Sequence, residues 1–126
     1  MLQELLKDKN KVLRKYEATT SVLKGETERD FINIAGEGQF YGIDLGRYAG
    51  CRIIIDGIEV YNLPGEKASG YVYPHPGYTH MWTAQSRVDA GIPCIEFKNT
   101  LIIKLSGHTQ YDSSTITCSY GLYEEA

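Results

Sequence analysis

The stretch CRIIIDGIEVY, residues 51–61, is the strongest indication of fold in this chain. Two runs rich in β-branched residues, which favour strands, flank the dipeptide Asp56-Gly57. An Asp-Gly pair readily adopts the positive φ angles of a type I′ turn, a common tight connection between antiparallel strands. The stretch therefore predicts a β-hairpin near the middle of the chain.

The neighbouring segments show the same period of two. Upstream, EATTSVLKG (17–25) predicts one strand, and FINIAGEGQFYGIDLG (31–46) predicts two short strands around a Gly-Glu-Gly bend. Downstream, IPCIEFKNTLIIKLSG (92–107) predicts a second hairpin that turns at Lys98-Asn99, and STITCSYGLYEE (114–125) predicts a last strand. About eight strands at such spacing predict an all-β fold, an antiparallel β-sandwich of the jelly-roll kind.

The first sixteen residues follow a different pattern. Apolar side chains recur at helical spacings, which predicts a helical arm over residues 1–16 ahead of a sandwich domain over residues 17–126. A helix this short is marginal in water unless it packs on something. We therefore expect a homo-oligomer, first as a coiled-coil trimer and second through packing on a neighbouring subunit. The expected contacts of the arm are Leu2, Leu5, Leu6, Val12 and Leu13.

Composition and charge narrow the class of protein. The chain has 126 residues, enough for one domain, and 42% of them are hydrophobic. Its net charge of −3 gives no basis for nucleic-acid binding. Residues 1–24 hold six basic and three acidic side chains, whereas the rest of the chain holds seven basic and thirteen acidic ones. This basic segment is either a solvated face or a surface for an acidic partner.

Cysteine usage and hydropathy indicate a protein made in a reducing cytoplasm. Cys51, Cys94 and Cys118 are odd in number and each lies in or beside an apolar run, so we expect buried, unreactive thiols. The early charges of MLQELLKDKN argue against a signal peptide. No apolar run approaches the roughly 20 residues needed to cross a bilayer, so no membrane partner is expected.

Residues 62–91 form a long excursion with three of the four prolines, and short strands are expected near 71–73 and 80–84. The segment YVYPHPGYTHMW (71–82) holds His75 and His80, five positions apart. Metal-binding jelly rolls need a tight His-x-His pair, which the sequence lacks. We therefore predict no metal site.

Catalytic patterns are weak throughout. Ser106-Gly107-His108 lacks the strand and helix that flank a hydrolase nucleophile, and no helix follows GEGQFYG (36–42) to bind a phosphate. Paired carboxylates are possible among sixteen acidic residues, but sequence spacing does not show whether any two meet at a glycosidase distance. We predict that the chain is not an enzyme and binds no cofactor, with a jelly-roll enzyme as the least favoured alternative.

Binding is the remaining class, and the aromatic cluster is its main candidate. Tyr71, Tyr73, Tyr78 and Trp82 each combine a large apolar face with a polar tip. Such side chains cap cores, dominate protein interfaces and stack on sugar rings. Three interpretations remain: part of the sandwich core, a subunit interface, or a carbohydrate contact. As interface or ligand contacts we name Tyr73, Tyr78 and Trp82.

The segments DFINIAGEGQFYGIDLG, CRIIIDGIEVY and IEFKNTLIIKLSG together resemble a pattern in small virion proteins of tailed bacteriophages and their prophages. In those modules a strand of the LLNISGSG type leads to an IIIDG hairpin, and an I-x-F-x-x-S-L-x-I segment follows near the C-terminus. The matching positions here are Phe31–Gly38, Ile53–Gly57, and Ile95, Phe97, Leu101 and Ile103. Asn99-Thr100 stands where the pattern has a serine, and YVYPHPGYTHMW has no counterpart.

The resemblance implies a non-catalytic structural module of a tail, collar, fibre or capsid decoration. Its expected location is the virion, after synthesis in the bacterial host cytoplasm. Its expected partners are copies of itself and other virion proteins, with a host-surface polysaccharide as a further partner. The alternative from another class is a carbohydrate-binding module for host-surface recognition.

Overall fold

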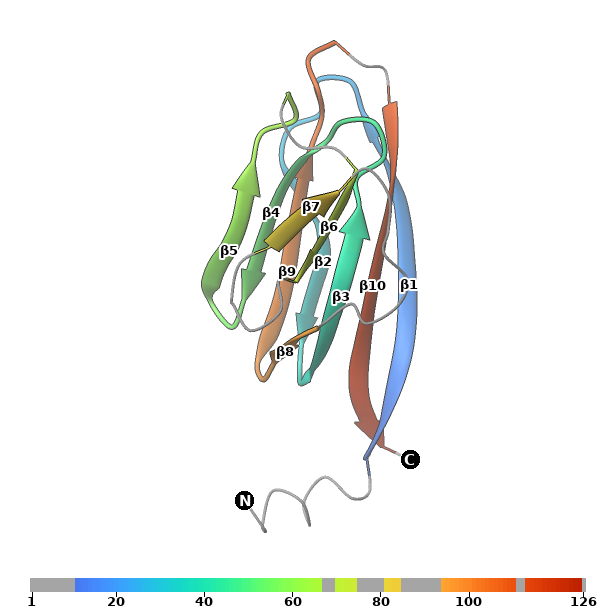
Figure 1. Cartoon of the computed structure of the whole chain (residues 1–126), viewed down its shortest axis with the longest axis vertical. Helices are drawn as coiled ribbons and strands as arrows, with labels where there is room; N and C mark the ends of the chain where they lie inside the picture. The colour runs from blue at the N-terminus through green and yellow to red at the C-terminus, as the bar shows by residue number, and fades with distance from the viewer. Residues whose placement is uncertain (1–10, 67–69, 75–80, 85–93, 111–112, 126) are drawn as a thin grey trace.

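The computed structural model describes residues 11–66, 70–74, 81–84, 94–110 and 113–125, and the regular structure in these ranges is entirely strand (Figure 1). The alternating residues predicted from the sequence account for most of these strands. In chain order they are β1 (Lys11–Leu23), β2 (Arg29–Ala35), β3 (Gly38–Asp44), β4 (Gly50–Ile55), β5 (Ile58–Leu63), β6 (Tyr71–Pro74), β7 (Met81–Ala84), β8 (Ile95–Phe97), β9 (Thr100–Ser106) and β10 (Ser113–Glu125).

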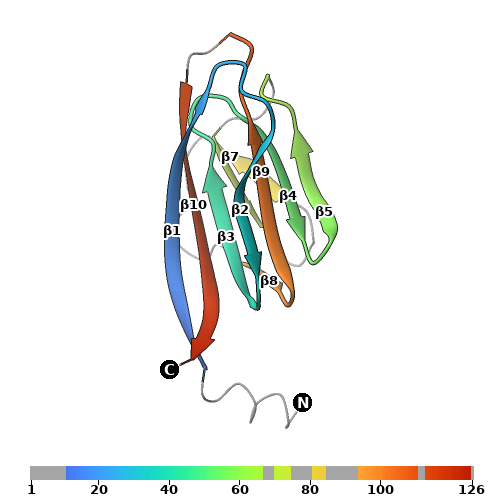
Figure 2. The same ribbon diagram turned by 180° about the vertical axis from the view of Figure 1, so that it is seen from behind.

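The strands form two antiparallel sheets, in the orders β1-β10-β3-β6-β7 and β2-β9-β4-β5. Strand β8 pairs with Gly38–Phe40 of β3, and β6 pairs with Ile43 and Asp44 of the same strand. Figures 1 and 2 show the β2-β9-β4-β5 sheet behind the other sheet in one view and in front of it in the other. Within this arrangement β1 pairs with β10, β2 with β9, β3 with β8 and β4 with β5.

One hydrophobic core lies between the sheets, and it is built by the period-two alternation seen in the sequence. Strand β9 alternates strictly between half-buried and fully buried residues. The first sheet contributes mainly Phe40, Ile43, Val72, Phe97, Ile116 and Cys118, and the second contributes mainly Ile32, Cys51, Ile53, Ile55, Leu101, Ile103 and Leu105. The predicted all-β fold with two antiparallel sheets is therefore confirmed.

The central hairpin is also confirmed. Asp56 and Gly57 have φ angles of 50° and 83°, and Ile55 pairs with Ile58 across the turn. Both turn residues therefore have the positive φ angles of a type I′ turn. The short strands expected in the long excursion are present as β6 and β7, and they pair with each other from Tyr71 opposite Ala84 to Pro74 opposite Met81.

The predicted second hairpin at Lys98-Asn99 is wrong. Strand β8 pairs with β3 in one sheet, whereas β9 pairs with β2 and β4 in the other. Lys98 and Asn99 therefore form a corner between sheets. Strands that face one core from opposite sheets show the same alternation as hairpin partners, so the sequence pattern does not distinguish the two cases. The bend between β2 and β3 crosses between the sheets in the same way.

The Asp56 carboxylate holds this corner in place. Its Oδ1 accepts backbone N–H groups of Lys98, Asn99 and Thr100 at 3.1, 2.7 and 3.0 Å. The Asp56 N–H donates in turn to the carbonyl of Thr100 at 3.0 Å. Partial burial opposes the charged form of Asp56, but the three backbone donors outweigh it and hold the pKa below its ordinary value.

The predicted N-terminal helix is wrong for residues 11–16. Strand β1 begins at Lys11, so residues 11–16 are extended and pair with the end of β10, from Lys11 opposite Glu125 to Tyr16 opposite Tyr120. Val12 and Leu13 are consecutive in a strand and point to opposite faces, so they do not share one apolar stripe. Pairing with β10 holds these residues extended and satisfies the backbone groups of alternate residues. Residues 1–10 lie outside the described ranges.

Candidate assembly surface

The most distinctive surface of the described chain is the ribbon formed by β1 and β10. The two strands pair without a register shift from Lys11 opposite Glu125 to Leu23 opposite Ser113. β1 is the end strand of its sheet, and no strand in the described residues pairs with its other side. Figure 1 shows the lower end of this ribbon extending beyond the neighbouring strands. The ribbon therefore presents one long open edge and a face that the second sheet covers only in part.

Exposed apolar side chains gather on β1. Four large hydrophobic side chains are exposed among the described residues, and three belong to this strand: Val12 at 39%, Tyr16 at 39% and Leu23 at 61%. The fourth is Ile58 beside the β4–β5 turn. Val12 was predicted from the sequence as a contact, whereas Tyr16 and Leu23 were not. Tyr16 had been placed on the helix, and Leu23 lies in the strand predicted over residues 17–25, whose place at a sheet edge the sequence does not show.

On the inner face of the ribbon, Tyr16 forms a small polar and aromatic cluster. Its ring stacks on Tyr120 with 5.6 Å between centroids. Its hydroxyl donates to the Glu124 carboxylate at 2.7 Å, and Arg14 forms an ion pair with the same carboxylate at 3.4 Å. The hydrogen bond to Glu124 raises the pKa of Tyr16. These contacts orient Tyr16 at the open edge of the sheet.

On the outer face, Gly121 leaves room for side chains from both neighbouring strands. A Cβ at Gly121 would lie 2.9 Å from the Tyr41 hydroxyl and 3.0 Å from a methyl group of Leu13. Lys15 Nζ lies 5.3 Å from the centre of the Tyr41 ring. The Tyr41 hydroxyl donates to Gln39 Oε1 at 2.7 Å. The predicted contact Leu13 therefore packs on this face within its own subunit.

The far end of the β1 edge is covered by two side chains from the segment that follows it. Arg29 donates to the Ser21 carbonyl at 2.8 Å and to Thr20 Oγ1 at 3.2 Å. Glu26 accepts the Leu23 N–H at 3.0 Å and forms an ion pair with Arg29. Protein side chains occupy the outward backbone groups here, so the accessible part of the edge is Lys11–Thr19.

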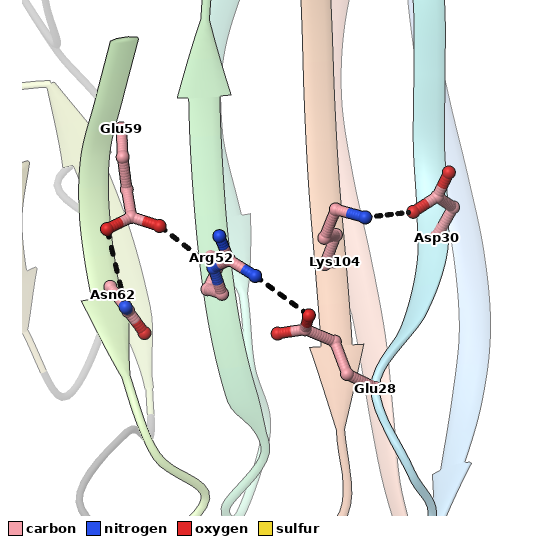
Figure 3. A network of polar contacts seen from close by, with 6 residues as sticks. All are labelled: Glu28, Asp30, Arg52, Glu59, Asn62 and Lys104. Carbon is pink, nitrogen blue, oxygen red and sulfur yellow. Dashed lines mark hydrogen bonds and ion pairs between the residues drawn. The ribbon is translucent and has the colours of Figure 1, made fainter. Parts of the chain in front are cut away.

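The outer face of the other sheet differs because its charges are paired with one another (Figure 3). Arg52 lies between Glu59 and Glu28, with an N–O distance of 2.8 Å to each. Lys104 binds Asp30 at 3.0 Å. Hydrogen bonds from Arg52 lower the pKa of Glu59, and both carboxylates raise the pKa of Arg52. Because these charged side chains bind one another, this face has less unpaired charge to attract a partner than the exposed Lys15 and Glu17 of β1 have.

The other predicted contact residues are placed only in part. Tyr73 and Trp82 lie directly opposite each other in the β6–β7 pair. Leu2, Leu5, Leu6 and Tyr78, together with His75 and His80, lie outside the described residues. Their roles as contacts stay predictions.

The cysteines and His108, the other reactive side chains of the described chain, pack within the fold. Burial raises the pKa of the Cys51 and Cys118 thiols. It also raises the pKa of the Cys94 thiol, which is less deeply buried. Nδ1 of the buried His108 accepts the Gln110 N–H at 2.8 Å, and its ring packs against Tyr48. No group of three His, Cys, Asp or Glu side chains suited to a metal ion occurs within the described ranges.

Comparison of the chain with protein-family models, curated proteins and solved structures returns no match. Within the described residues, no helix is long and apolar enough to span a membrane.

Proposed function

We propose that this chain is a non-catalytic structural protein of a phage or prophage virion and that it assembles into a symmetric homo-oligomer. In this role its sandwich is a rigid building block, and the β1–β10 ribbon carries the contact between copies. The open β1 edge is the observation that carries the proposal. Natural sheets normally cover or shorten an edge of this length, because it offers unpaired backbone groups to other chains.

The strand order supports a jelly roll as the finer description of the fold. The pairs β1–β10, β2–β9, β3–β8 and β4–β5 are nested like those of one long hairpin folded over on itself. With β6 and β7 as an inserted hairpin, the two sheets become β1-β10-β3-β8 and β2-β9-β4-β5. Eight strands in two sheets with this order are typical of jelly rolls, a fold of viral capsid and lectin domains.

The segments that carry the resemblance to virion proteins are adjacent in space. The IIIDG hairpin contains Asp56, and the I-x-F-x-x-T-L-x-I segment contains the corner that Asp56 binds. A single acidic turn residue thus links two parts of the pattern that are far apart in the sequence. The Asp56 carboxylate binds only backbone N–H groups of the corner, so this contact does not depend on which side chains stand at Asn99 and Thr100.

Two measurements test the proposal. Sedimentation equilibrium of the full chain should give a closed oligomer at micromolar concentration. Mass spectrometry of purified phage particles from a host that encodes the chain should detect it in stoichiometric amounts. A strict monomer that is missing from the particles would contradict the proposal.

A carbohydrate-binding surface is the second candidate, and the outer face of the first sheet favours it. Gln39 bridges two tyrosines there, accepting from Tyr41 at 2.7 Å and donating to the Tyr123 hydroxyl at 3.3 Å. It also donates to Glu96 at 3.4 Å. Aromatic rings beside amide and carboxylate groups are the chemistry that binds sugar rings. Tyr41→Ala should then abolish polysaccharide binding, whereas Tyr61→Phe in the other sheet should leave it unchanged.

A further inference from the structure

The backbone groups on the open edge of β1 can be identified from the bonds at its far end. Arg29 binds the Ser21 carbonyl and Glu26 binds the Leu23 N–H, and both side chains approach from the side away from β10. In a strand, the N–H and C=O of one residue point to the same edge and those of the next residue to the opposite edge. The β1–β10 pairing has no register shift, so this alternation continues along the whole strand.

Between Val12 and Thr19, the residues that offer free backbone groups to another strand are therefore Leu13, Lys15, Glu17 and Thr19. The residues between them, Arg14, Tyr16 and Ala18, bond to β10. A second strand can pair with this edge only if its own outward-pointing residues stand opposite these four. For two copies of β1 in antiparallel arrangement, an odd-numbered residue must then meet an odd-numbered residue.

Charge, together with the Arg29 contact that occupies the Ser21 carbonyl, selects one register among those that remain. A twofold axis at Arg14, Lys15 or Glu17 would place each of these charged residues opposite itself, which is unfavourable between neighbouring strands. A twofold axis at Tyr16 places Lys15 opposite Glu17 of the second copy, and the symmetry repeats this pair. Both side chains are exposed on the outer face, and they come from the same strand, so the edge is complementary to itself.

We propose that β1 pairs antiparallel with β1 of a second copy about a twofold axis at Tyr16. The β1-containing sheet of each copy then joins that of the other copy into one continuous sheet across the contact. This inference rests on the proposed function as a homo-oligomer and specifies the contact. It replaces the coiled-coil trimer expected from the sequence, because Val12 and Leu13 belong to a strand.

The neighbouring contacts fit this register. The paired segment is Leu13–Thr19 in both copies, and each outward pair can exchange two N–H···O=C bonds. A longer overlap would bring Lys11 opposite Ser21, whose carbonyl already binds Arg29. At the axis, Tyr16 meets Tyr16 of the second copy as a closely spaced pair, which extends the row begun by its stacking on Tyr120.

Charge exchange tests the pairing. Lys15→Glu and Glu17→Lys each place two like-charged pairs across the contact, and each should raise the dimer dissociation constant roughly tenfold. The double variant Lys15→Glu/Glu17→Lys restores opposite charges and should return the constant to near the wild-type value. Lys98→Glu, which changes the net charge by the same amount as Lys15→Glu at an exposed site away from β1, is the control for that variant and should have no effect.

Cysteine cross-linking determines the register directly. In a Cys94→Ser background, Tyr16→Cys should form a disulfide-linked dimer under mild oxidation, because residue 16 alone meets its own copy across the axis. Lys15→Cys and Glu17→Cys should cross-link poorly, although each would be favoured by an axis at its own position. Buried Cys51 and Cys118 are retained in all variants.

The outcomes separate the inference from the proposed function. An oligomer that ignores the charge exchange, or that cross-links best at position 15 or 17, overturns the twofold pairing at Tyr16 but leaves self-assembly intact. A wild-type chain that remains monomeric at high concentration overturns both.

Discussion

At the scale of single residues, Asp56 carries more of the fold than its place in a turn suggests. It adopts a positive φ of 50° within the β4–β5 turn, and its carboxylate binds three consecutive N–H groups of the corner between β8 and β9. The turn of one hairpin therefore fixes the point at which the chain passes from one sheet to the other. The sequence identified the turn but contained no information on the second role, which depends on a contact between distant segments.

Replacement of Asp56 should show this second role. Asp56→Ala removes the acceptor for three backbone donors and should lower the free energy of unfolding by about 2–4 kcal/mol, since bonds to charged groups are stronger than neutral ones. Asp56→Asn is the matched control, because it tolerates a positive φ and keeps one acceptor oxygen. Urea unfolding at pH 7 measures both. Equal losses for the two variants would contradict the role of the carboxylate.

The pH dependence follows from the lowered pKa of Asp56. The folded state binds this proton less tightly than the unfolded state, so the contribution is complete above the ordinary pKa of 3.8 and is lost as the pH falls through the lower folded value. We expect the stability difference between wild type and Asp56→Asn to shrink as the pH falls from 5 toward 2. Unfolding titrations at several pH values measure this difference, and a constant difference would assign the stabilisation to another group.

Substitutions at Gly57 test the energetic cost of its backbone conformation without any change in side-chain packing. Its φ is 83°, and a Cβ there would meet nothing within 4 Å, so a substitution adds strain without a clash. Gly57→Val should lower the free energy of unfolding by about 1–2 kcal/mol, the cost of a left-handed conformation in a branched residue. Gly57→Asn should cost clearly less, because asparagine adopts this conformation more readily. Thermal unfolding of the two variants in parallel measures the difference.

At the scale of strands, alternation was predictable and sheet membership was not. The strands around Asp56-Gly57 and the last strand were predicted from sequence. The core contains or contacts every second residue of that last strand, namely Ile116, Cys118, Tyr120 and Leu122. The corner at Lys98-Asn99 was mistaken for a hairpin because inward-facing residues alternate alike in both sheets. The start of β1 was mistaken for a helix because Val12, Leu13 and Tyr16 fit a helical spacing, and six residues are too few for the sequence alone to exclude a strand.

The same limits apply to the candidate surface. Val12 could be predicted as an exposed apolar residue, but the open edge of β1 follows from its pairing with β10, the last strand of the chain. A contact over such a separation in sequence leaves no local pattern. The contacts of Arg29 and Glu26 that end the accessible edge could not be predicted either, because the sequence indicates only a charged loop there.

Arg29 should limit unwanted association at the β1 edge. Arg29→Ala frees the Ser21 carbonyl and extends the accessible edge, which should increase aggregation on heating. Arg52→Ala removes an arginine with two carboxylate partners from the other sheet and is the matched control. Light scattering during a thermal ramp compares the variants. Equal aggregation of both variants would show that Arg29 has no protective role at the edge.

At the scale of the whole molecule, the two sheets share one core, and their cysteines report on it. Cys51 belongs to the second sheet with 2% of its surface exposed, and Cys118 belongs to the first with none exposed. Each side chain lies in the single cluster of buried residues between the sheets. Neither sheet can therefore expose its thiol without disturbing the core that the other sheet needs.

The rates of thiol modification should test this coupling. Cys94 is half-buried and should react first, whereas Cys51 and Cys118 should react only when the core opens. With a global unfolding free energy of ordinary size, both should react at least about a thousandfold more slowly than Cys94. Because one core opens as a unit, the two slow rates should agree with each other within about a factor of three and respond equally to urea. Modification followed by peptide mass spectrometry resolves the three sites. If Cys118 reacted tenfold faster than Cys51, the first sheet would open on its own, and the β1–β10 ribbon would then be a separately unfolding element.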